Sequence, residues 1–387
     1  MLRIHSRIPS GIHPFARRLA VLALGTSACC AQAATFEVLH TFDFGDGWNP
    51  NGAMVIDAAG VLYGTTEVGG PFNWGTLFKF ENGTLTTLHF FDQTPDPGGA
   101  FPMGDLLMDP SGALYGTTAK EAGKFGTIFK YDAVGGYQVV HTFKGGAEGG
   151  NPAGGLARGR DGTLYGATSS LNDDTCSAGK ACGTVFRFDP VTLQLKTIHT
   201  FDGTDGAYPQ STPTLFAGRL YTTTAGSFLG AGSPASMKPN GKHFATFTTD
   251  GDADKFESGL APDAAGNLWG VSGQGGPATD GTIYRIDPSG VYHTVFSFSG
   301  ADGIHPQGTP VFDGSGRLVG ITAHGGRHHV GTVFRFDPAT GTLTTLHDFE
   351  GDDGPRAGVT LDAQGTIYGT TVGTRNVNWG TIWRVVP

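Results

Sequence analysis

The sequence predicts an all-β protein, a seven-bladed β-propeller with four short strands in each blade. Three observations lead to this prediction. A two-part motif, Leu-Tyr-Gly-Thr-Thr followed by Gly-Thr-aliphatic-aromatic, recurs about every fifty residues. No long stretch beyond the N-terminus has apolar residues at helical spacing. The 64 glycines supply the tight turns that many short strands require.

The motif occurs six times in full and once in part. The full copies begin at Leu62, Leu114, Leu164, Leu268, Leu318 and Ile367, and their second halves begin at Gly75, Gly126, Gly183, Gly281, Gly331 and Gly380. A weak copy at Leu220–Thr224 lacks the second half. Repeat units cannot bury their own faces and must stack. Residues 34–387 are therefore expected to form a single propeller domain, with about 51 residues per blade.

The first unit illustrates the expected strands, which cover residues 53–56, 61–66, 76–80 and 84–91. A turn at 57–60 joins the first strand to the second. Glu81-Asn82-Gly83 joins the third to the fourth, and Asn-Gly between alternating apolar runs is a strong hairpin signal. Third strands carry apolar residues on both faces, so both faces of the sheet must be covered, as they are in a propeller blade.

The two ends of the chain predict how the ring closes. Residues 35–42 have the pattern of a lone fourth strand, whereas the chain stops after a third strand at 379–386. We therefore expect the N-terminal strand to complete the last blade, because this arrangement leaves no open sheet edge.

Antiparallel order places successive connections alternately on the two faces of the ring. The connections from first to second strand and from third to fourth are short and uniform. The connections from second to third strand, and from fourth to the next first, are long and variable. Binding residues concentrate on loops held by a rigid scaffold. Any site is therefore expected on this second face, the long-loop face.

Residues 1–33 have the features of a signal peptide. Arg17 and Arg18 precede an apolar run at 19–24, and Ala31-Gln32-Ala33 offers a cleavage site. The apolar run is too short for a membrane span. We expect a secreted or periplasmic protein without membrane insertion after signal removal. A lipoprotein attached through Cys29 or Cys30 is the alternative, although Thr26 stands where a lipid-attachment motif has Leu.

The charge of the chain excludes some classes of partner, and its cysteines predict a disulfide. Removing residues 1–33, which hold four arginines and no acid, changes the formal charge from −9 to −13. Nucleic acids and anionic lipids need a basic footprint, so neither is an expected partner. Cys176 and Cys182 are close in sequence within an exported chain, which predicts a local disulfide. We expect a monomer.

The repeated elements resemble those of the GloVer tandem-repeat proteins of bacteria. The shared elements are Leu-Tyr-Gly-Thr-Thr, Gly-Gly, Gly-Thr-Val-Phe and His-Thr-Phe, with Asp-Gly-x-x-Pro between units, over nearly all of 35–387. The resemblance implies an extracellular or envelope location and no established activity. Members of the family often carry a C-terminal anchor, and this chain departs from that pattern because Pro387 directly follows a strand. Kelch propellers are a more distant likeness.

Residues that break the repeat are better functional candidates than those found in most blades. Three aromatic side chains precede prolines in the loops between units and could stack on sugar rings or pack on the next blade. Four histidines stand out from the repeat in neighbouring loops. These ligand-binding candidates are Trp48, Phe101, Tyr208, His305, His324, His328 and His329. The histidine loop contains no Cys, Asp or Glu, so a solvated or ligand-facing loop is favoured over zinc.

A second candidate is a calcium site at Asp250, Asp252 and Asp254, which alternate like the start of a calcium loop. Lys255 and Ala261 replace the Gly and Glu of an EF-hand, which leaves only a looser calcium site. No other cofactor is expected. The repeated loop aspartates and fourth-strand histidines are interpreted as structural, with the aspartates accepting backbone N–H groups.

The sequence contains no nucleophile elbow, phosphate loop or dinucleotide fingerprint. This favours a binding or scaffold module for extracellular glycan or protein ligands, with no catalytic residues assigned. Two alternatives stay open. One is a propeller enzyme acting on polysaccharide, a lyase or glycosidase, and the other is a structural matrix protein without a defined ligand.

Overall fold

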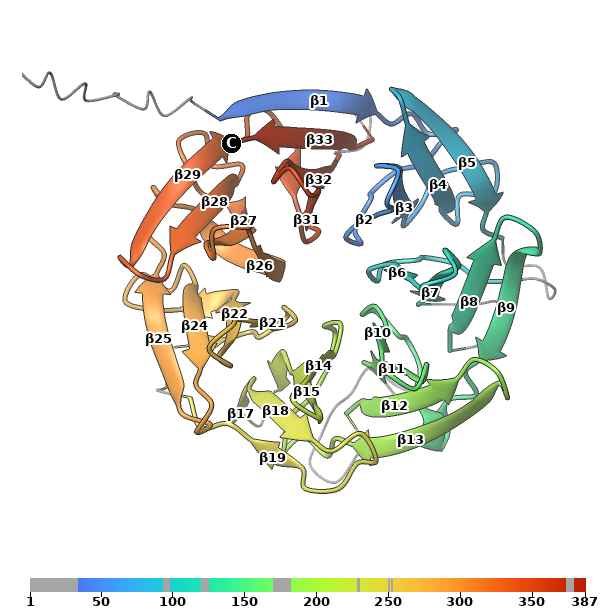
Figure 1. Cartoon of the computed structure of the whole chain (residues 1–387), viewed down its shortest axis with the longest axis horizontal. Coiled ribbons are helices and arrows are strands. Elements are labelled where there is room, and N and C mark those ends of the chain that lie inside the picture. The colour runs from blue at the N-terminus through green and yellow to red at the C-terminus, as the bar shows by residue number, and fades with distance from the viewer. Residues whose placement is uncertain are drawn as a thin grey trace, which may run out of the picture. The chain divides into compact units, whose positions relative to one another are not determined.

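A computed structural model describes residues 34–92, 98–119, 125–169, 182–227, 230–249, 251, 253–373 and 379–387. Residues Ala34–Pro387 form one compact unit, a ring of seven antiparallel sheets (Figure 1). The seven-bladed, all-β prediction is confirmed. The predicted signal peptide lies outside the described residues.

Six blades contain four consecutive main strands. Blade 1 holds β2 (Val55–Ile56), β3 (Leu62–Thr66), β4 (Thr76–Glu81) and β5 (Thr84–Phe90). Blade 2 holds β6 (Leu107–Met108), β7 (Leu114–Thr118), β8 (Thr127–Asp132) and β9 (Gly136–Thr142). Blade 3 holds β10 (Ala157–Arg158), β11 (Leu164–Thr168), β12 (Thr184–Asp189) and β13 (Gln194–Thr200). Blade 4 holds β14 (Thr214–Phe216), β15 (Arg219–Thr223), β18 (Pro234–Met237) and β19 (Ala245–Thr246). Blade 5 holds β21 (Ala261–Pro262), β22 (Leu268–Ser272), β24 (Thr282–Ile286) and β25 (Tyr292–Ser297). Blade 6 holds β26 (Ile304–Phe312), β27 (Leu318–His324), β28 (Thr332–Asp337) and β29 (Thr342–Asp348).

The seventh blade combines both ends of the described chain. It holds β30 (Gly354–Pro355), β31 (Thr360–Leu361), β32 (Ile367–Val372), β33 (Thr381–Val386) and the N-terminal β1 (Thr35–Thr41). The connecting loops hold a short 3₁₀ helix at Gly146–Glu148 and two small ribbons. One ribbon pairs β16 (Gly226–Ser227) with β17 (Gly230–Ala231), and the other pairs β20 (Ala253–Asp254) with β23 (Gln274–Gly275).

The predicted ring closure is confirmed. Strand β1 pairs antiparallel with β33 from Thr35↔Val386 to Thr41↔Thr381. It forms the outer edge of blade 7 beside β33 in Figure 1. The ring of Phe36 packs edge-on against Phe349 of blade 6, with ring centroids 5.7 Å apart. The first described strand therefore binds the last blade to its neighbour.

In six of the seven blades, a glycine in the second strand accommodates an aromatic side chain of the third strand. A Cβ atom added to Gly64 would lie 2.5 Å from Cζ of Phe78, and one added to Gly116 would lie 2.4 Å from Cζ of Phe129. The same approach occurs at Gly166, Gly270, Gly320 and Gly369. Both Phe78 and Phe129 are completely buried. Such contacts explain why Leu-Tyr-Gly and Gly-Thr-aliphatic-aromatic recur together, since each half of the motif needs the other.

The motif threonines form a buried bridge between the same two strands. The hydroxyls of Thr66 and Thr76 are 2.9 Å apart, and those of Thr118 and Thr127 are 2.8 Å apart. Blades 3, 5, 6 and 7 repeat the pair. In blade 5 the first member of the pair is Ser272. Each hydroxyl can also bond to a backbone carbonyl, as Thr66 does to Val68 and Thr76 to Asp46, so the pair joins the two strands and the adjoining loops.

Blade 4, the weak copy, has the same strand order with different packing. Thr222 stands at the glycine position and pairs with Ala235, which stands at the aromatic position. The small Ala235 leaves room for the threonine side chain, and both residues are buried. Blade 4 is therefore complete although it lacks the second half of the motif, because the smaller Ala235 compensates for the larger Thr222.

Candidate ligand-binding site at the ring axis

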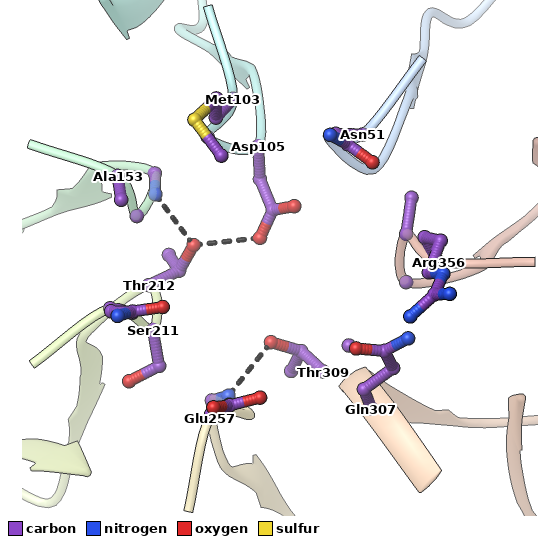
Figure 2. A pocket seen from close by; sticks show the side chains of 18 residues that line it. Asn51, Met103, Asp105, Ala153, Ser211, Thr212, Glu257, Gln307, Thr309 and Arg356 are labelled. Atoms are coloured by element: carbon purple, nitrogen blue, oxygen red, sulfur yellow. Dashed lines mark hydrogen bonds between the residues drawn. The ribbon is translucent and has the colours of Figure 1, made fainter. Parts of the chain in front are cut away.

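The connections between blades bring one residue from each blade to the ring axis. In six blades this residue directly follows a proline, and in blade 5 it follows Phe256. The seven axial residues are Asn51, Met103, Ala153, Gln210, Glu257, Gln307 and Arg356. They line a pocket of about 230 Å³, shown in Figure 2. The repeat fixes the place of these residues but not their chemistry.

The backbone reaches the axis through an unusual conformation. The residue before each proline, or before Phe256, has a left-handed φ in six blades, between 51° and 60°. These residues are Asn49, Phe101, Asn151, Tyr208, Lys255 and His305. Positive φ is uncommon for residues other than glycine, and its cost concentrates at functional sites. In blade 7 the position is Gly354.

Small residues follow the axial position and allow the loops to meet. A Cβ atom on Gly52 would lie 2.4 Å from the Gly104 carbonyl oxygen, and one on Gly104 would lie 2.5 Å from that of Gly154. The loops therefore touch through their backbones around the axis. Larger residues here would open the ring.

Asp105 and Thr212 form a fixed network beside the pocket. Asp105 accepts hydrogen bonds from the Ala53 N–H, at 2.8 Å, and from the Thr212 hydroxyl, at 2.7 Å. Thr212 in turn accepts from the Gly155 N–H at 3.0 Å. Four blades are joined in this way. Because both Asp105 oxygens already accept hydrogen bonds, this carboxylate is a structural group rather than a free acid or base.

The opposite side of the pocket holds polar groups without such partners. Figure 2 shows the side chains of Gln307 and Arg356 pointing toward one another across the pocket edge. Nε2 of Gln307 is buried and has no hydrogen-bond partner among the described residues. The exposed Arg356 forms no ion pair within the described part of the chain. Both groups are hydrogen-bond donors that a ligand could satisfy.

Glu257 is the acidic member of the same pocket. Burial raises the pKa of this carboxyl, Lys255 opposes the rise, and Asp254 adds to it. By contrast, the axial amide of Asn51 donates to Glu67 at 2.6 Å. The pocket thus combines a carboxyl that resists ionisation with a permanently charged guanidinium.

A groove of about 400 Å³ continues outward from Arg356. His324 and His329 line it, together with Asn49 and Asp352. His305 lies next to His324, with ring centroids 6.3 Å apart. Burial lowers the pKa of both His305 and His324, and the positive charge of Arg356 lowers both further. Lys255 also lowers the pKa of His305. The structure therefore brings three of the four predicted histidines near Arg356.

His328 lies apart from this group, because its Nε2 is 3.4 Å from the exposed Glu350 carboxylate. No cluster of three or more metal-binding side chains occurs among the described residues. Of the candidate calcium residues, Asp250 and Asp252 lie outside the described residues. Asp254 accepts hydrogen bonds from the backbone N–H groups of Gly232 and Lys255.

The predicted aromatic residues pack against other aromatic residues of their own loops and blades. Trp48 contacts Trp379 at 5.3 Å and donates to the Gly373 carbonyl at 3.3 Å. Phe101 contacts Trp74 at 5.0 Å. Tyr208 packs against the core between blades 3 and 4. None of the three lines the axial pocket or the histidine groove. These contacts agree with packing against the protein, which is one of the two interpretations given above; the other is stacking on sugar rings.

Two further expectations concern structural residues. Asp46 and Asp205 accept the N–H groups of Asp43 and Asp202, and they also bond to the strand histidines His40 and His199, each at 2.9 Å. Cys182 is buried in the same core as Tyr208, whereas Cys176 lies outside the described residues, so their pairing stays a prediction.

The seven axial residues were missed by sequence reasoning, although a signal was present. Aligning the units on the loop proline gives one column that is different in nearly every blade. The predicted candidates Phe101, Tyr208 and His305 precede the proline, but the residue after the proline reaches the axis.

The fold has counterparts among solved structures. A protein described as a hybrid two-component system of B. thetaiotaomicron has an extracellular domain with a TM-score of 0.58 at 12% identity. That match covers 89% of this chain and 39% of the other, so the chain spans about two fifths of its length. The oligogalacturonate lyase of Vibrio parahaemolyticus matches with a TM-score of 0.55 at 12% identity, over 92% and 97% of the two chains. At such identities the likeness shows the fold alone.

No curated protein matches the sequence. Within the described residues, no helix is long and apolar enough to cross a membrane. The Gloeobacter/Verrucomicrobia repeat, however, matches residues 27–233 and 222–387, which together include the whole propeller. The chain belongs to this repeat family.

Proposed function

We propose that the propeller is an extracellular binding module that holds an anionic glycan at the ring axis. One observation carries the proposal. The surroundings of the pocket repeat in every blade, but the residues that face the axis vary. Two of these residues, Gln307 and Arg356, offer donors for which the described residues supply no partner. Guanidinium groups bind carboxylates through two parallel hydrogen bonds. The neighbouring His305 and His324 add positive charge when protonated.

The size of the site fits a short ligand segment. About 230 Å³ at the axis is below the usual range for drug-sized ligands, and the groove adds about 400 Å³. One sugar unit at the axis with a second in the groove would use both spaces. The export signal predicted at residues 1–33 supports an extracellular ligand.

A lyase acting at the same pocket is the second candidate. Its specific support is Glu257, because burial raises the pKa of this carboxyl toward the range of a general acid or base. A glycosidase has less support, since it needs two available carboxyl groups. Asp105, the other acidic residue of the pocket, is held by two hydrogen bonds.

Binding of galacturonate oligosaccharides to residues 34–387 tests the proposal, with neutral maltose oligosaccharides as the comparison. We expect binding of the anionic series alone, and loss of that binding in the Gln307→Ala/Arg356→Ala variant. Arg187→Ala is the matched control, because Arg187 is exposed on the third strand of blade 3. Equal binding of both series, or no effect of the double variant, would contradict the proposal.

The same samples separate binding from catalysis. Ultraviolet absorbance of unsaturated sugar products, recorded over hours, reports a lyase. Absorbance that rises with the native protein and stays flat with Glu257→Gln would favour the second candidate. A parallel binding series with EDTA tests whether calcium is needed. If Arg356 is the main contact, binding of the oligosaccharide should be retained in EDTA.

A further inference from the structure

The face opposite the long loops has a uniform design in five blades. The turn between first and second strand begins with an aspartate. In blade 1, Asp57 accepts hydrogen bonds from the Ala59 and Val61 N–H groups, both at 2.9 Å. Asp109, Asp263, Asp313 and Asp362 accept the equivalent pairs. Their second oxygen often accepts from the following strand, as from Trp269 Nε1 at 2.8 Å.

Blade 3 breaks this design. Its turn begins Arg158-Gly159-Arg160, where blade 1 has Ile56-Asp57-Ala58. Arg158 thus stands at a position that is apolar in every other blade, and Gly159 replaces the turn aspartate. The exchange moves the turn carboxylate from the first turn position to Asp161, two residues further on, and introduces two guanidinium groups. Loss of a repeated structural residue together with two added charges points to a local role other than holding the blade.

The adjacent turn of blade 4 also departs from the repeat. It is shorter by one residue, and its central residues Ala217 and Gly218 have positive φ values of 47° and 76°. Positive φ at both central positions defines a tight type I′ hairpin. The shortened turn leaves space beside blade 3 where a full turn would otherwise extend.

A cavity of about 720 Å³ occupies this place. Tyr165, Leu215, Phe216 and Pro239 give it apolar walls, and Arg158 and Arg160 lie at its edge. Leu215 and Phe216 are only half-buried, so part of their apolar surface faces the cavity.

The charges around the cavity are unbalanced. Both arginines are exposed, and neither forms an ion pair among the described residues. Asp161 is the one acid in the lining, and it accepts the Thr163 N–H at 3.1 Å. Asp109 of blade 2 accepts backbone N–H groups of its own turn, and the nearby charge of Arg158 helps to lower its pKa.

We infer that this cavity, the blade 3–4 pocket, is a second binding site for a small organic anion with a flat apolar body. The oxyanion, whether carboxylate, sulfonate or phosphate, would pair with Arg158 and Arg160, since guanidinium groups bind such anions with two hydrogen bonds. The apolar body would cover Phe216, Leu215 and the Tyr165 ring. The inference does not depend on the axial pocket, because the two sites share no lining residue.

The aromatic sulfonate 8-anilinonaphthalene-1-sulfonate is a suitable probe, because it joins an anion to a flat apolar body and its fluorescence reports binding. N-phenyl-1-naphthylamine, the same body without the sulfonate, is the matched uncharged probe. We expect saturable binding of the sulfonate to residues 34–387, weakened by salt, with at least about tenfold lower affinity for the uncharged probe.

Restoring the repeat should abolish the site. The variant Arg158→Ile/Gly159→Asp/Arg160→Ala gives blade 3 the Ile-Asp-Ala sequence of blade 1 at these three positions, and we expect about tenfold or more loss of sulfonate affinity. Gly159 has no positive φ, but a Cβ atom there would lie 2.7 Å from Oδ1 of Asp161, so the Asp161 side chain must rotate away to admit the aspartate. Arg317→Ala, on the same face in blade 6, removes an arginine paired with Asp313 and should leave affinity unchanged.

The single variant Arg160→Ala keeps the test decisive if the triple variant folds poorly, because Arg160 is exposed and its loss cannot disturb packing. We expect it to weaken sulfonate binding several-fold with an unchanged melting temperature. No sulfonate binding by the native protein, equal binding of the two probes, or native affinity in a folded triple variant would overturn the inference.

Discussion

Two positions that recur in each blade behave in opposite ways. The second-strand position that packs on the aromatic ring is glycine in six blades, whereas the axial position holds Asn, Met, Ala, Gln, Glu, Gln and Arg. Glycine is required because a Cβ atom there would lie within about 2.6 Å of a ring atom. The axial position contacts an open pocket and carries no such constraint. Packing therefore fixes residue identity at the glycine position, whereas residue identity is free to differ at the axis.

The largest effect is expected from placing the same side chain at the packing position of two blades. Gly116→Val in blade 2 forces its Cβ into the Phe129 ring, and we expect a loss of about 3 kcal/mol or more in the free energy of unfolding. Thr222→Val in blade 4 should be neutral or stabilising, because Thr222 faces Ala235 and its buried hydroxyl has no partner among the described residues. Urea unfolding measures both. Similar losses in the two variants would show that the glycine is not a packing requirement.

A repeated histidine of the fourth strand gives the next largest effect. Burial lowers the pKa of His89 to about 4, and its ring stacks on Tyr137 with centroids 3.7 Å apart. The unfolded chain, with an ordinary histidine pKa, binds the proton first, so stability falls as the pH drops from about 6.5 to about 4. For this half-buried ring we expect a loss of about 2 kcal/mol.

His89→Phe keeps the stack and removes the titration. Its free energy of unfolding should therefore change less between pH 7 and pH 4 than that of the native protein. Urea unfolding at each pH measures both changes. Parallel curves for the two proteins would mean that His89 takes up its proton at the ordinary pKa in the folded state.

The turn aspartates test the comparison at a smaller scale. Asp57→Ala removes an acceptor for two backbone N–H groups, and a cost of about 1 kcal/mol is expected. Gly159→Asp introduces an acceptor at the same position in blade 3, but its Cβ atom would lie 2.7 Å from Oδ1 of Asp161, so we expect no gain in stability. Thermal unfolding of the two single variants checks the sign. If Asp57→Ala stabilises the protein, Asp57 does not have the structural role assigned to it here.

The blade count and the ring closure could be predicted from sequence because packing repeats itself. Each glycine–aromatic contact requires the same residue types, so the same motif recurs in the sequence. The lone strand predicted at 35–42 pairs with the last strand at 381–386. The interpretation of His40 and Asp46 as structural also followed from repetition, and the two residues bond to each other at 2.9 Å.

The site residues were harder to predict for the same reason. A residue with left-handed φ, such as Tyr208 or His305, turns the chain so that the residue after the proline reaches the axis instead of the conspicuous one. Nothing in an isolated Gln307 marks it as functional. Its position becomes informative only when seven loops are superposed. The blade 3–4 pocket was missed because the short-turn face was expected to be plain, and the Arg158-Gly159-Arg160 exception was not compared with the other turns.

The central claim is that axial residues serve binding and not folding. The most direct test measures both properties on one variant, Gln307→Ala/Arg356→Ala, by urea unfolding and by calorimetric titration with a galacturonate oligosaccharide. We expect an unfolding free energy within about 0.5 kcal/mol of the native value, together with loss of measurable binding. A variant that unfolds several kcal/mol more easily, or that binds the oligosaccharide as the native protein does, would contradict the account.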